Sequence, residues 1–374
     1  MNAQLWQANV ENAPLNRRGW VCQERLLSPR TLHFGTDQLY WECRTRTCCE
    51  FYPTGLPYIV PGVSRTKSLF TKIESQMLDD LIDPEETVVY GYQLWSDIVE
   101  KYSRSTLTFQ SDRLVAVAGL AAKIQRMVRD EYCAGLWKKQ LLSHLLWRAN
   151  PMDRKQGDEL VSGPNSLEYV APSWSWASTQ CPVEAVYFDP EFHYPVAEIL
   201  DLQLNLVNKG DVFGALKDAA VQIRGRLVKA TMVKRREQLR LHFSPNSRNF
   251  LRWMPETPES PQTSSWRISG SQNSNSRLGI YPNQGTFPNT TLRYNLYFLL
   301  VQMTTWTSYA GLILKRRDED HTVFERWGSF QTNSIEEPEL FEQQFANFDE
   351  GCLREGLDFC EYPGGGFQYD VTIV

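Results

Sequence analysis

Residues 17–43 read RRGWVCQERLLSPRTLHFGTDQLYWEC, and this stretch sets the first expectations about the fold. Arg17 to Leu27 predicts a short helix, which Pro29 stops because proline lacks a backbone donor and restricts the residue before it. Two β-prone runs then flank the turn-forming residues Gly35 to Asp37, a pattern typical of a β-hairpin. The N-terminal part of the chain is therefore expected to combine helix and sheet.

The middle of the chain, residues 67–148, has helical periodicity. Apolar residues recur there at steps of four and three, which is typical of one buried helix face. Ser111 is a suitable N-cap and predicts the start of a second helix, and residues 136–148 predict a third. The stripe of the first helix comprises Val88, Tyr92, Trp95, Val99 and Tyr102, and that of the second comprises Leu114, Val117, Ala118, Ala121, Ile124 and Val128.

The C-terminal half changes to a two-residue alternation, which indicates strands with one buried face. Leu200, Leu202, Leu204 and Leu206 alternate with polar residues, and similar patterns recur in 221–227, 239–243, 294–303 and 309–314. Residues 255–290, rich in Ser, Asn, Pro and Gly, are predicted to form a disordered loop. A helix is expected over 336–348, and the tail around 364–366 is expected to be flexible.

Composition excludes several classes of protein. The 374 residues carry a formal charge of −5, which offers no general attraction to nucleic acid. The first 16 residues lack the pattern of a secretory signal, and the longest apolar run, 296–303, is far shorter than the roughly 20 residues that span a bilayer. We therefore expect no membrane span and a cytoplasmic protein, whose eight cysteines are free thiols.

Common catalytic and metal-binding motifs are absent from the sequence. It contains no phosphate-binding Walker loop, no Gly-x-Ser-x-Gly, no His-Glu-x-x-His and no Cys-x-x-Cys. Cys43, Cys48 and Cys49 with His33 offer ligand chemistry for zinc, but structural zinc sites use regularly spaced pairs. No metal and no cofactor are expected.

One block is distinctive enough to suggest a family. Residues 14–35, PLNRRGWVCQERLLSPRTLHFG, followed by QLYWEC at 38–43, closely resemble the signature block of the fungal heterokaryon incompatibility (HET) domain family. APSWSWAS at 171–178 resembles a later motif of the same family, and the similarity weakens after Leu200. The residues that carry the resemblance are Arg18, Gly19, Trp20, Gln23, Glu24, Arg25, Leu26, Trp41, Glu42, Cys43, Trp174 and Trp176.

The resemblance implies a fold and a function. In the family this block closes the HET domain, and strands encoded upstream would supply the middle of an α/β sheet similar to the TIR fold. Here only 13 residues precede Pro14, so the domain is expected to be truncated. The family role is non-self recognition and regulated cell death after fusion of unlike fungal cells. Its partners would be proteins, through self-association or a recognition receptor, and an activity that needs both halves of the domain would be lost by truncation.

The chemistry of the block leaves two interpretations open. In the first interpretation, Glu24 or Glu42 is a catalytic or ligand-binding carboxylate, as a TIR-like hydrolase that cleaves NAD would require. Alternatively, Arg18, Glu24, Arg25 and Glu42 form a semi-buried ion-pair network that holds the helix against the hairpin, which is the interpretation we favour. A third possibility for the chain is a non-catalytic interaction module. Trp174 and Trp176 are expected to share one face of a strand and to anchor a core.

Together these observations predict an α+β protein with a truncated α/β, TIR-like remnant, a helical middle layer and a C-terminal antiparallel β region. The predicted boundaries are 1–66 for the C-terminal part of a HET domain and 67–180 for the helical segment. A mostly β domain is expected over 190–335, and a helix with a flexible tail over 336–374.

Overall fold

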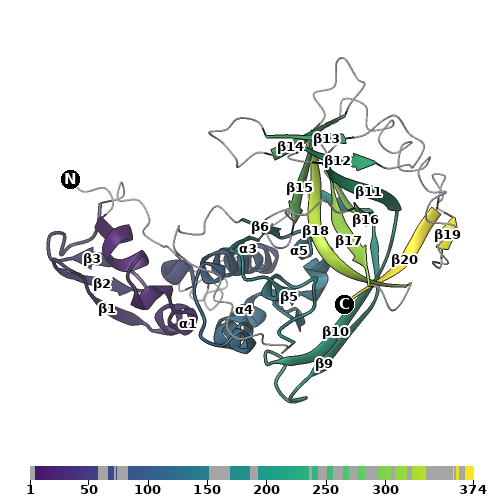
Figure 1. Cartoon of the computed structure of the whole chain (residues 1–374). Coiled ribbons are helices and arrows are strands. Elements are labelled where there is room, and N and C mark those ends of the chain that lie inside the picture. The colour runs from purple at the N-terminus through teal and green to yellow at the C-terminus, as the bar shows by residue number, and fades with distance from the viewer. Residues whose placement is uncertain are drawn as a thin grey trace. The chain divides into compact units, whose positions relative to one another are not determined.

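The predicted N-terminal helix and hairpin are both present. Helix α1 spans Gly19–Leu27, and strands β1 (Arg30–Phe34) and β2 (Leu39–Cys43) pair antiparallel around the expected turn (Figure 1). The computed structural model describes residues 5–57, 66–70, 73, 83–150, 169–185, 193–235, 238–242, 251–255, 264–268, 277–282, 293–304, 308–317, 322–333, 357, 359–361 and 367–374.

The described residues divide into two compact units. One contains residues 1–139 and 206–215, and the other contains residues 140–205 and 216–374. The first has helices and small sheets, and the second has a large, mostly antiparallel sheet. The chain is therefore a mixed α+β protein, as the sequence predicts. Among the described residues, no helix is both long and apolar enough to cross a membrane.

In the first unit, a three-stranded antiparallel sheet follows α1 in the order β1-β2-β3. Strand β3 (Thr47–Cys49) lies within a segment, 44–65, that its proline and glycine content predicts to be a loop. That prediction is wrong for these residues, because they pair with β2 from Tyr40 to Glu42. A π-helical turn, Gln7–Glu11, and a 3-10 turn, Leu15–Arg17, precede α1.

Helices α3 (Pro84–Ser103) and α4 (Ala118–Val128) bury most of the stripes that their periodicity predicts, and Leu114 and Val117 of the second stripe are buried just before α4. Ser111 does not cap α4, which begins at Ala118 after two 3-10 turns, Gln110–Asp112 and Val115–Val117. The helix expected over 136–148 is also absent. Its place is taken by β4 (Tyr132–Cys133), β5 (Leu136–Trp137), a 3-10 turn (Lys138–Gln140), α5 (Leu141–His144) and β6 (Arg148–Ala149).

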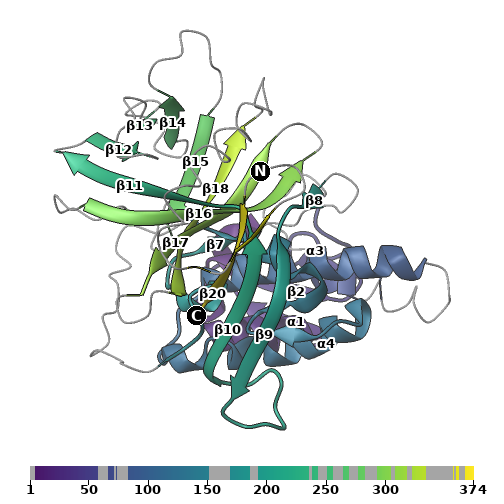
Figure 2. The same ribbon diagram turned by 90° about the vertical axis from the view of Figure 1, so that its right-hand side faces the viewer.

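The second unit contains a sheet of 13 strands, whose longest run has the order β15-β14-β13-β12-β11-β16-β17-β18-β20-β10-β9. Figure 2 shows β9, β10 and β20 side by side. β15 also pairs with β18, so the run from β15 to β18 closes on itself. The bounds are β7 Val183–Glu184, β8 His193–Pro195, β9 Glu198–Leu206, β10 Leu216–Gly225, β11 Leu227–Arg235, β12 Gln238–His242, β13 Leu251–Pro255, β14 Ser264–Ile268, β15 Arg277–Pro282, β16 Arg293–Thr304, β17 Tyr309–Arg316, β18 Val323–Asn333, β19 Phe359–Glu361 and β20 Phe367–Ile373.

Two of these strands correct the prediction of a disordered loop over 255–290. β14 and β15 pair with each other and extend the sheet, because Trp266, Leu278 and their neighbours provide β-prone residues between the polar stretches. The predicted flexible tail likewise contains β20, which pairs with β10 from Val221 to Gly225. The helix expected over 336–348 and the glycines at 364–366 lie outside the described residues.

Candidate functional site

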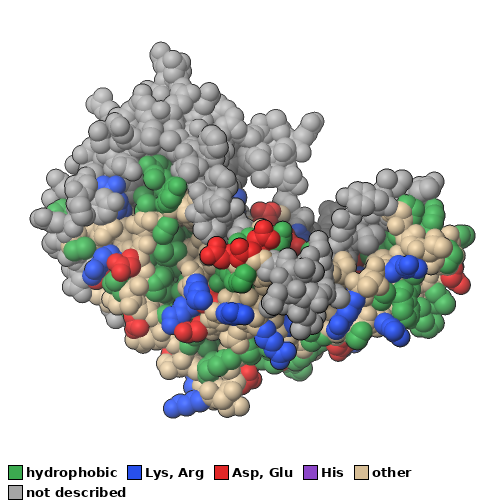
Figure 3. Space-filling view, turned by 180° about the vertical axis from the view of Figure 1, so that it is seen from behind, with side chains coloured by type: hydrophobic (Ala, Val, Ile, Leu, Met, Phe, Trp, Pro, Cys, Tyr) green, Lys and Arg blue, Asp and Glu red, His purple; other side chains and the backbone are tan. Residues whose placement is uncertain are grey.

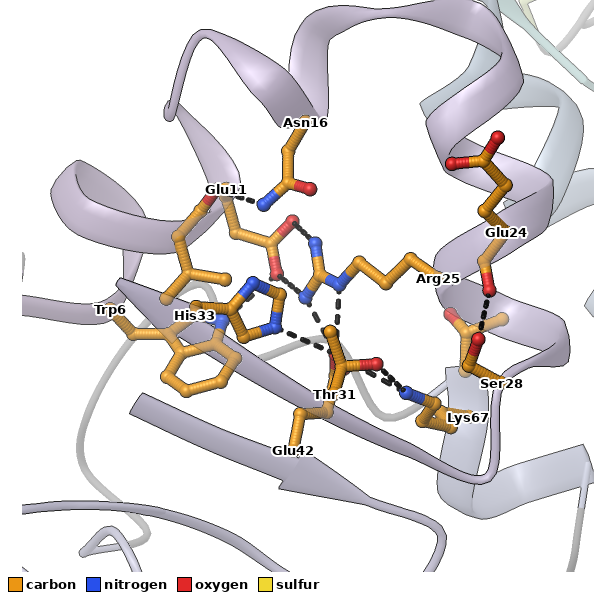
Figure 4. A network of polar contacts seen from close by, with 12 residues as sticks. Trp6, Glu11, Asn16, Glu24, Arg25, Ser28, Thr31, His33, Glu42 and Lys67 are labelled. Carbon is orange, nitrogen blue, oxygen red and sulfur yellow. Dashed lines mark hydrogen bonds and ion pairs between the residues drawn. The ribbon is translucent and has the colours of Figure 1, made fainter. Parts of the chain in front are cut away.

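A buried polar cluster forms in the first unit where α1 faces the hairpin (Figure 4). We call it the Glu42 network. Its central residue, Glu42, lies on β2 with a side chain only 3% exposed. Alternation along β2 points Glu42 and Tyr40 toward the interior, while Leu39, Trp41 and Cys43 lie on the opposite face. The network comprises Glu11, Arg25, Thr31, His33, Glu42 and Lys67.

Arg25 of α1 joins two carboxylates. Its Nε donates to Glu42 Oε2 at 2.8 Å and its Nη2 to Glu42 Oε1 at 3.2 Å. The same guanidinium donates from Nη1 and Nη2 to the two oxygens of Glu11 at 3.0 and 2.8 Å. Two-pronged contacts of this kind match the planar fork of arginine to carboxylates. Arg25 therefore fixes the chain before α1 and the hairpin after it to the same helix.

Two further residues of the network contact Glu42. His33 Nε2 lies 3.3 Å from Glu42 Oε2, and since the carboxylate accepts, this nitrogen is the protonated one. Lys67 Nζ lies 3.7 Å from the same oxygen and donates to Thr31 Oγ1 at 2.8 Å. The Lys67 side chain is 2% exposed, so its ammonium group is removed from solvent. Glu42 thus accepts hydrogen bonds from Arg25 and His33 and forms an ion pair with Lys67.

Trp6 closes one side of the network. Its Nε1 donates to Glu11 Oε1 at 2.9 Å, and its indole packs edge-on against the rings of His33 and Tyr40 at 6.0 and 5.8 Å between centroids. Edge-to-face packing of this type is favourable for aromatic rings. The charged groups are therefore bounded by a buried aromatic cluster.

The surroundings shift the pKa values of the network residues in opposite directions. Burial alone would raise the pKa of Glu42, but hydrogen bonds from His33 and Arg25 and the charge of Lys67 outweigh it and lower the pKa to about 2. Burial lowers the pKa of Lys67 below its ordinary value, although Glu42 opposes this. Burial would also lower the pKa of Arg25, but Glu11 and Glu42 raise it above its ordinary value.

These contacts fit a structural role for the Glu42 network better than a role in proton transfer. Two basic residues, Arg25 and Lys67, lie among two carboxylates, Glu11 and Glu42, so each carboxylate has at least one basic partner. A carboxylate with a pKa of about 2 is a poor general base near neutral pH and is not protonated to serve as a general acid. Buried charges that are paired and hydrogen-bonded in this way pin elements together.

The structure changes the membership of the predicted network. The Arg25–Glu42 pair is present, but Glu24 is exposed, and in the described part of the chain no ion pair or side-chain hydrogen bond includes its carboxylate. Figure 4 shows the Glu24 carboxylate directed away from Arg25. Arg18 is exposed too, and its backbone forms a bridge with Thr106 instead. The prediction that Arg18 and Glu24 belong to the network is wrong.

Other residues of the block contact the helical part of the unit. Gly19 donates from its backbone to Thr106 O at 2.8 Å, and a Cβ at this position would lie 2.5 Å from Leu107 Cδ2. Trp20 Nε1 donates to Asp112 Oδ2 at 3.2 Å.

Gln23 completes these contacts, because its Oε1 accepts from the backbone N–H of Gly119, in the first turn of α4, at 2.6 Å. Leu26 is half-buried on α1. The block therefore joins the hairpin, through α1, to α4 and to the segment between α3 and α4.

Trp41 and Cys43 lie on the outer face of the sheet, away from the Glu42 network. Burial would raise the pKa of Cys43, but hydrogen bonds from the Thr45 side chain and from the backbone of Thr45 and Arg46 lower it to about 7. Within the residues that the structure describes, no three His, Cys, Asp or Glu side chains gather as metal ligands. Cys43, Cys48, Cys49 and His33 therefore do not come together as a set of metal ligands in the described part of the chain.

Trp174 and Trp176 belong to the second unit and are almost completely buried. Trp174 O accepts from Trp147 Nε1 at 2.9 Å, and the Arg326 guanidinium lies 3.7 Å from the Trp147 ring centroid. Their role as core anchors is confirmed, but the strand expected for them is not. Trp176 begins a 3-10 turn, Trp176–Ser178, because the Ser175 hydroxyl caps Ala177 N.

Sequence reasoning missed Glu11, Thr31 and Lys67 as members of the Glu42 network and Trp6 as the side chain that closes one side of it. Glu11 lies 14 residues before Arg25, and Lys67 follows a stretch predicted as a loop, so no periodic pattern connects them. His33 was considered only as a metal ligand. The alternation of side chains along the strand is the signal that could have placed His33 in the network. It puts His33 and Thr31, two residues apart, on the face that carries Glu42.

Comparison of the chain with protein-family models, with curated protein sequences and with solved structures found no match in any of the three.

Proposed function

We propose that the chain is a HET-type protein of a filamentous fungus, connected with non-self recognition and regulated cell death, and that it acts in the cytoplasm by binding protein partners. The proposal rests on the resemblance of residues 14–43 and 171–178 to that family. On this proposal, the α1–β3 region corresponds to the closing part of an α/β domain similar to the TIR fold.

One observation favours a binding role over catalysis. Of the two candidate carboxylates, Glu42 is buried and fully engaged by Arg25, His33 and Lys67, and Glu24 is exposed without a polar partner in the described residues. A catalytic carboxylate needs access to substrate and a pKa matched to its task. Glu42 lacks access to substrate and its pKa is held low, and no described residue orients the Glu24 carboxylate, so the block is better suited to position a surface than to cleave NAD.

A NAD-cleavage assay tests this proposal. The purified chain is incubated with NAD, and nicotinamide release is followed by chromatography, with the Glu42→Gln and Glu24→Gln variants beside the parent. We expect no release above the buffer control from any of the three. Nicotinamide release by the parent that disappears in a folded Glu24→Gln or Glu42→Gln variant would instead assign the chain as a TIR-like hydrolase.

A cellular measurement tests the recognition part of the proposal. The chain is expressed in one of two fungal strains, and cell death is scored with a vital dye before and after the strains fuse. We expect unfused cells to survive and death to appear only in fused cells of unlike strains. Equal survival of all fused cells, with and without the chain, would contradict a role in non-self recognition.

A further inference from the structure

Strand β1 leaves one edge of the N-terminal sheet without a partner strand in the described residues. The order β1-β2-β3 places β1 at the end of the sheet. Free strand edges present unpaired backbone donors and acceptors to other chains, and natural proteins often protect them with proline, lysine or a bulge. Within Arg30–Phe34, β1 has no proline, lysine or bulge, its register with β2 is regular, and its only outward-facing charged residue is Arg30 at one end.

The hydrogen bonds at the turn establish which residues of β1 face outward. Gly35 N donates to Gln38 O, and Cys43 N donates to Arg46 O on the other side of β2. Because backbone groups alternate in direction along a strand, Thr31 and His33 point theirs toward β2. The N–H and C=O groups of the remaining three residues, Arg30, Leu32 and Phe34, therefore point to the free edge.

The same three residues are exposed on the outer face. β1 alternates exposed and half-buried residues from Arg30 to Phe34, with Leu32 46% and Phe34 81% exposed. In Figure 3, the surface of the region that contains this sheet, at the right of the view, shows hydrophobic side chains together with Lys and Arg. A single strand thus offers free backbone groups and an apolar side-chain row.

We propose that β1 pairs antiparallel with β1 of a second copy of this chain, centred on Leu32. With this register, all five residues of the strand overlap, and Leu32 lies opposite Leu32 of the second copy. Arg30 then lies opposite Phe34 of the other copy, twice by symmetry, which permits a cation–π contact at each end. The three outward residues on each strand complete ~6 backbone hydrogen bonds.

The side chains of β1 complement those of a second β1 strand in antiparallel pairing, and this favours a second copy of the chain as the partner at the free edge. Antiparallel pairing places the two Arg30 side chains at opposite ends, so like charges do not meet, and each guanidinium faces an exposed aromatic ring. Parallel pairing would place Arg30 beside Arg30, which costs free energy. The pairing would also enlarge a three-stranded sheet that is small by itself.

This inference deepens the proposed function by naming one protein partner, and its test uses a different measurement from NAD cleavage. Sedimentation equilibrium of the whole chain from about 1 μM to about 1 mM measures self-association. We expect a monomer–dimer equilibrium for the parent. In Phe34→Lys, Lys lies opposite Arg30 of the other copy, and in Arg30→Glu the cation–π contact is lost, so both variants should dimerise at least about tenfold more weakly.

The double variant Arg30→Glu/Phe34→Lys tests the register. It places Glu opposite Lys at both ends, so its dimerisation should return to within about threefold of the parent. Phe109→Lys is the matched control, because Phe109 is 66% exposed in the same unit but lies outside the sheet. Circular dichroism verifies that each variant is folded.

Three results would overturn the inference. They are a parent that stays monomeric up to about 1 mM, a double variant no stronger than the single variants, and equal weakening by Phe109→Lys. Nicotinamide release in the assay above would contradict the proposed function and leave this pairing standing, so the two failures can be told apart.

Discussion

Glu24 and Glu42 show how neighbouring positions in one motif reach opposite environments. Arg25 follows Glu24 directly on α1, and at 3.6 residues per turn the two side chains point about 100° apart around the helix. Arg25 consequently faces the hairpin, and Glu24 faces solvent. The sequence allowed the Arg25–Glu42 pair to be predicted, since charge and proximity suffice. The sequence did not show that Glu24 lies outside the Glu42 network, because this depends on which face of the nine-residue helix α1 is buried.

Replacement of Glu42 by Gln is expected to destabilise the protein. The amide keeps the shape of the side chain but leaves Arg25 and Lys67 with one carboxylate fewer in a buried site, a change that costs about 3–5 kcal/mol. Urea unfolding followed by tryptophan fluorescence measures the loss. Glu24→Gln is the matched control and should change stability by less than about 0.5 kcal/mol. Equal stability of the two variants would contradict a structural role for the Glu42 network.

Stability should also depend on pH through Glu42. Its pKa is lowered from 4.5 in the unfolded chain to about 2 in the folded one, so the unfolded state binds more protons between these values. The contribution of Glu42, about 3 kcal/mol at 1.36 kcal/mol per pKa unit, is complete above pH 4.5 and is lost as the pH falls toward 2. Other carboxylates titrate in the same range, so the measurement is the difference between parent and Glu42→Gln in urea midpoints. That difference should shrink from pH 6 to pH 3, and a constant difference would contradict the assignment.

Among the elements, the β1–β2 hairpin and helices α3 and α4 were predicted from local patterns, but the β4–β5 hairpin was not. The turn at 35–37 identified β1 and β2, but residues 136–148 were predicted as one helix, and only Leu141–His144 of that stretch are α-helical. The reason lies upstream, where Ala134 and Gly135 adopt φ angles of 51° and 93°. Positive φ at both central residues is typical of the tight turns that join hairpin strands, and it produces β4 and β5.

Close packing between strands gives a further prediction at Gly311 of β17. A Cβ at this position would lie 2.2 Å from the backbone oxygen of Leu299 on β16 and 2.5 Å from the Phe330 ring. Because a backbone atom of a neighbouring strand cannot move aside easily, Gly311→Ala should destabilise the protein by about 3 kcal/mol or more. Thermal unfolding measures this change.

Gly210→Ala is the matched control for that substitution, since the nearest atom to its Cβ would be Asn208 Oδ1 at 3.6 Å. Its thermal midpoint should stay close to that of the parent. A similar midpoint for Gly311→Ala would show that β16 and β17 separate to accept a methyl group.

At the scale of the whole molecule, the division into helical and β parts followed from periodicity, but the sheet order did not. Each strand pattern shows which residues are buried, yet it carries no information about which strand lies beside it. β10 pairs with β20, and Arg224 forms an ion pair with Asp370, 146 residues further along, at 2.7 Å. Contacts at such separations depend on the complete packing of the unit.

The position of β20 in the sheet has a consequence for synthesis of the chain. β20 lies between β10 and β18, and Val374 O accepts hydrogen bonds from the backbone and the hydroxyl of Ser173. While the ribosome is still adding residues 367–373, β10 and β18 are already made but have no strand between them. Both edges therefore stay open to other nascent chains during that interval, when pairings between distant segments form slowly. Chaperone demand should accordingly be high until β20 has been made and has paired.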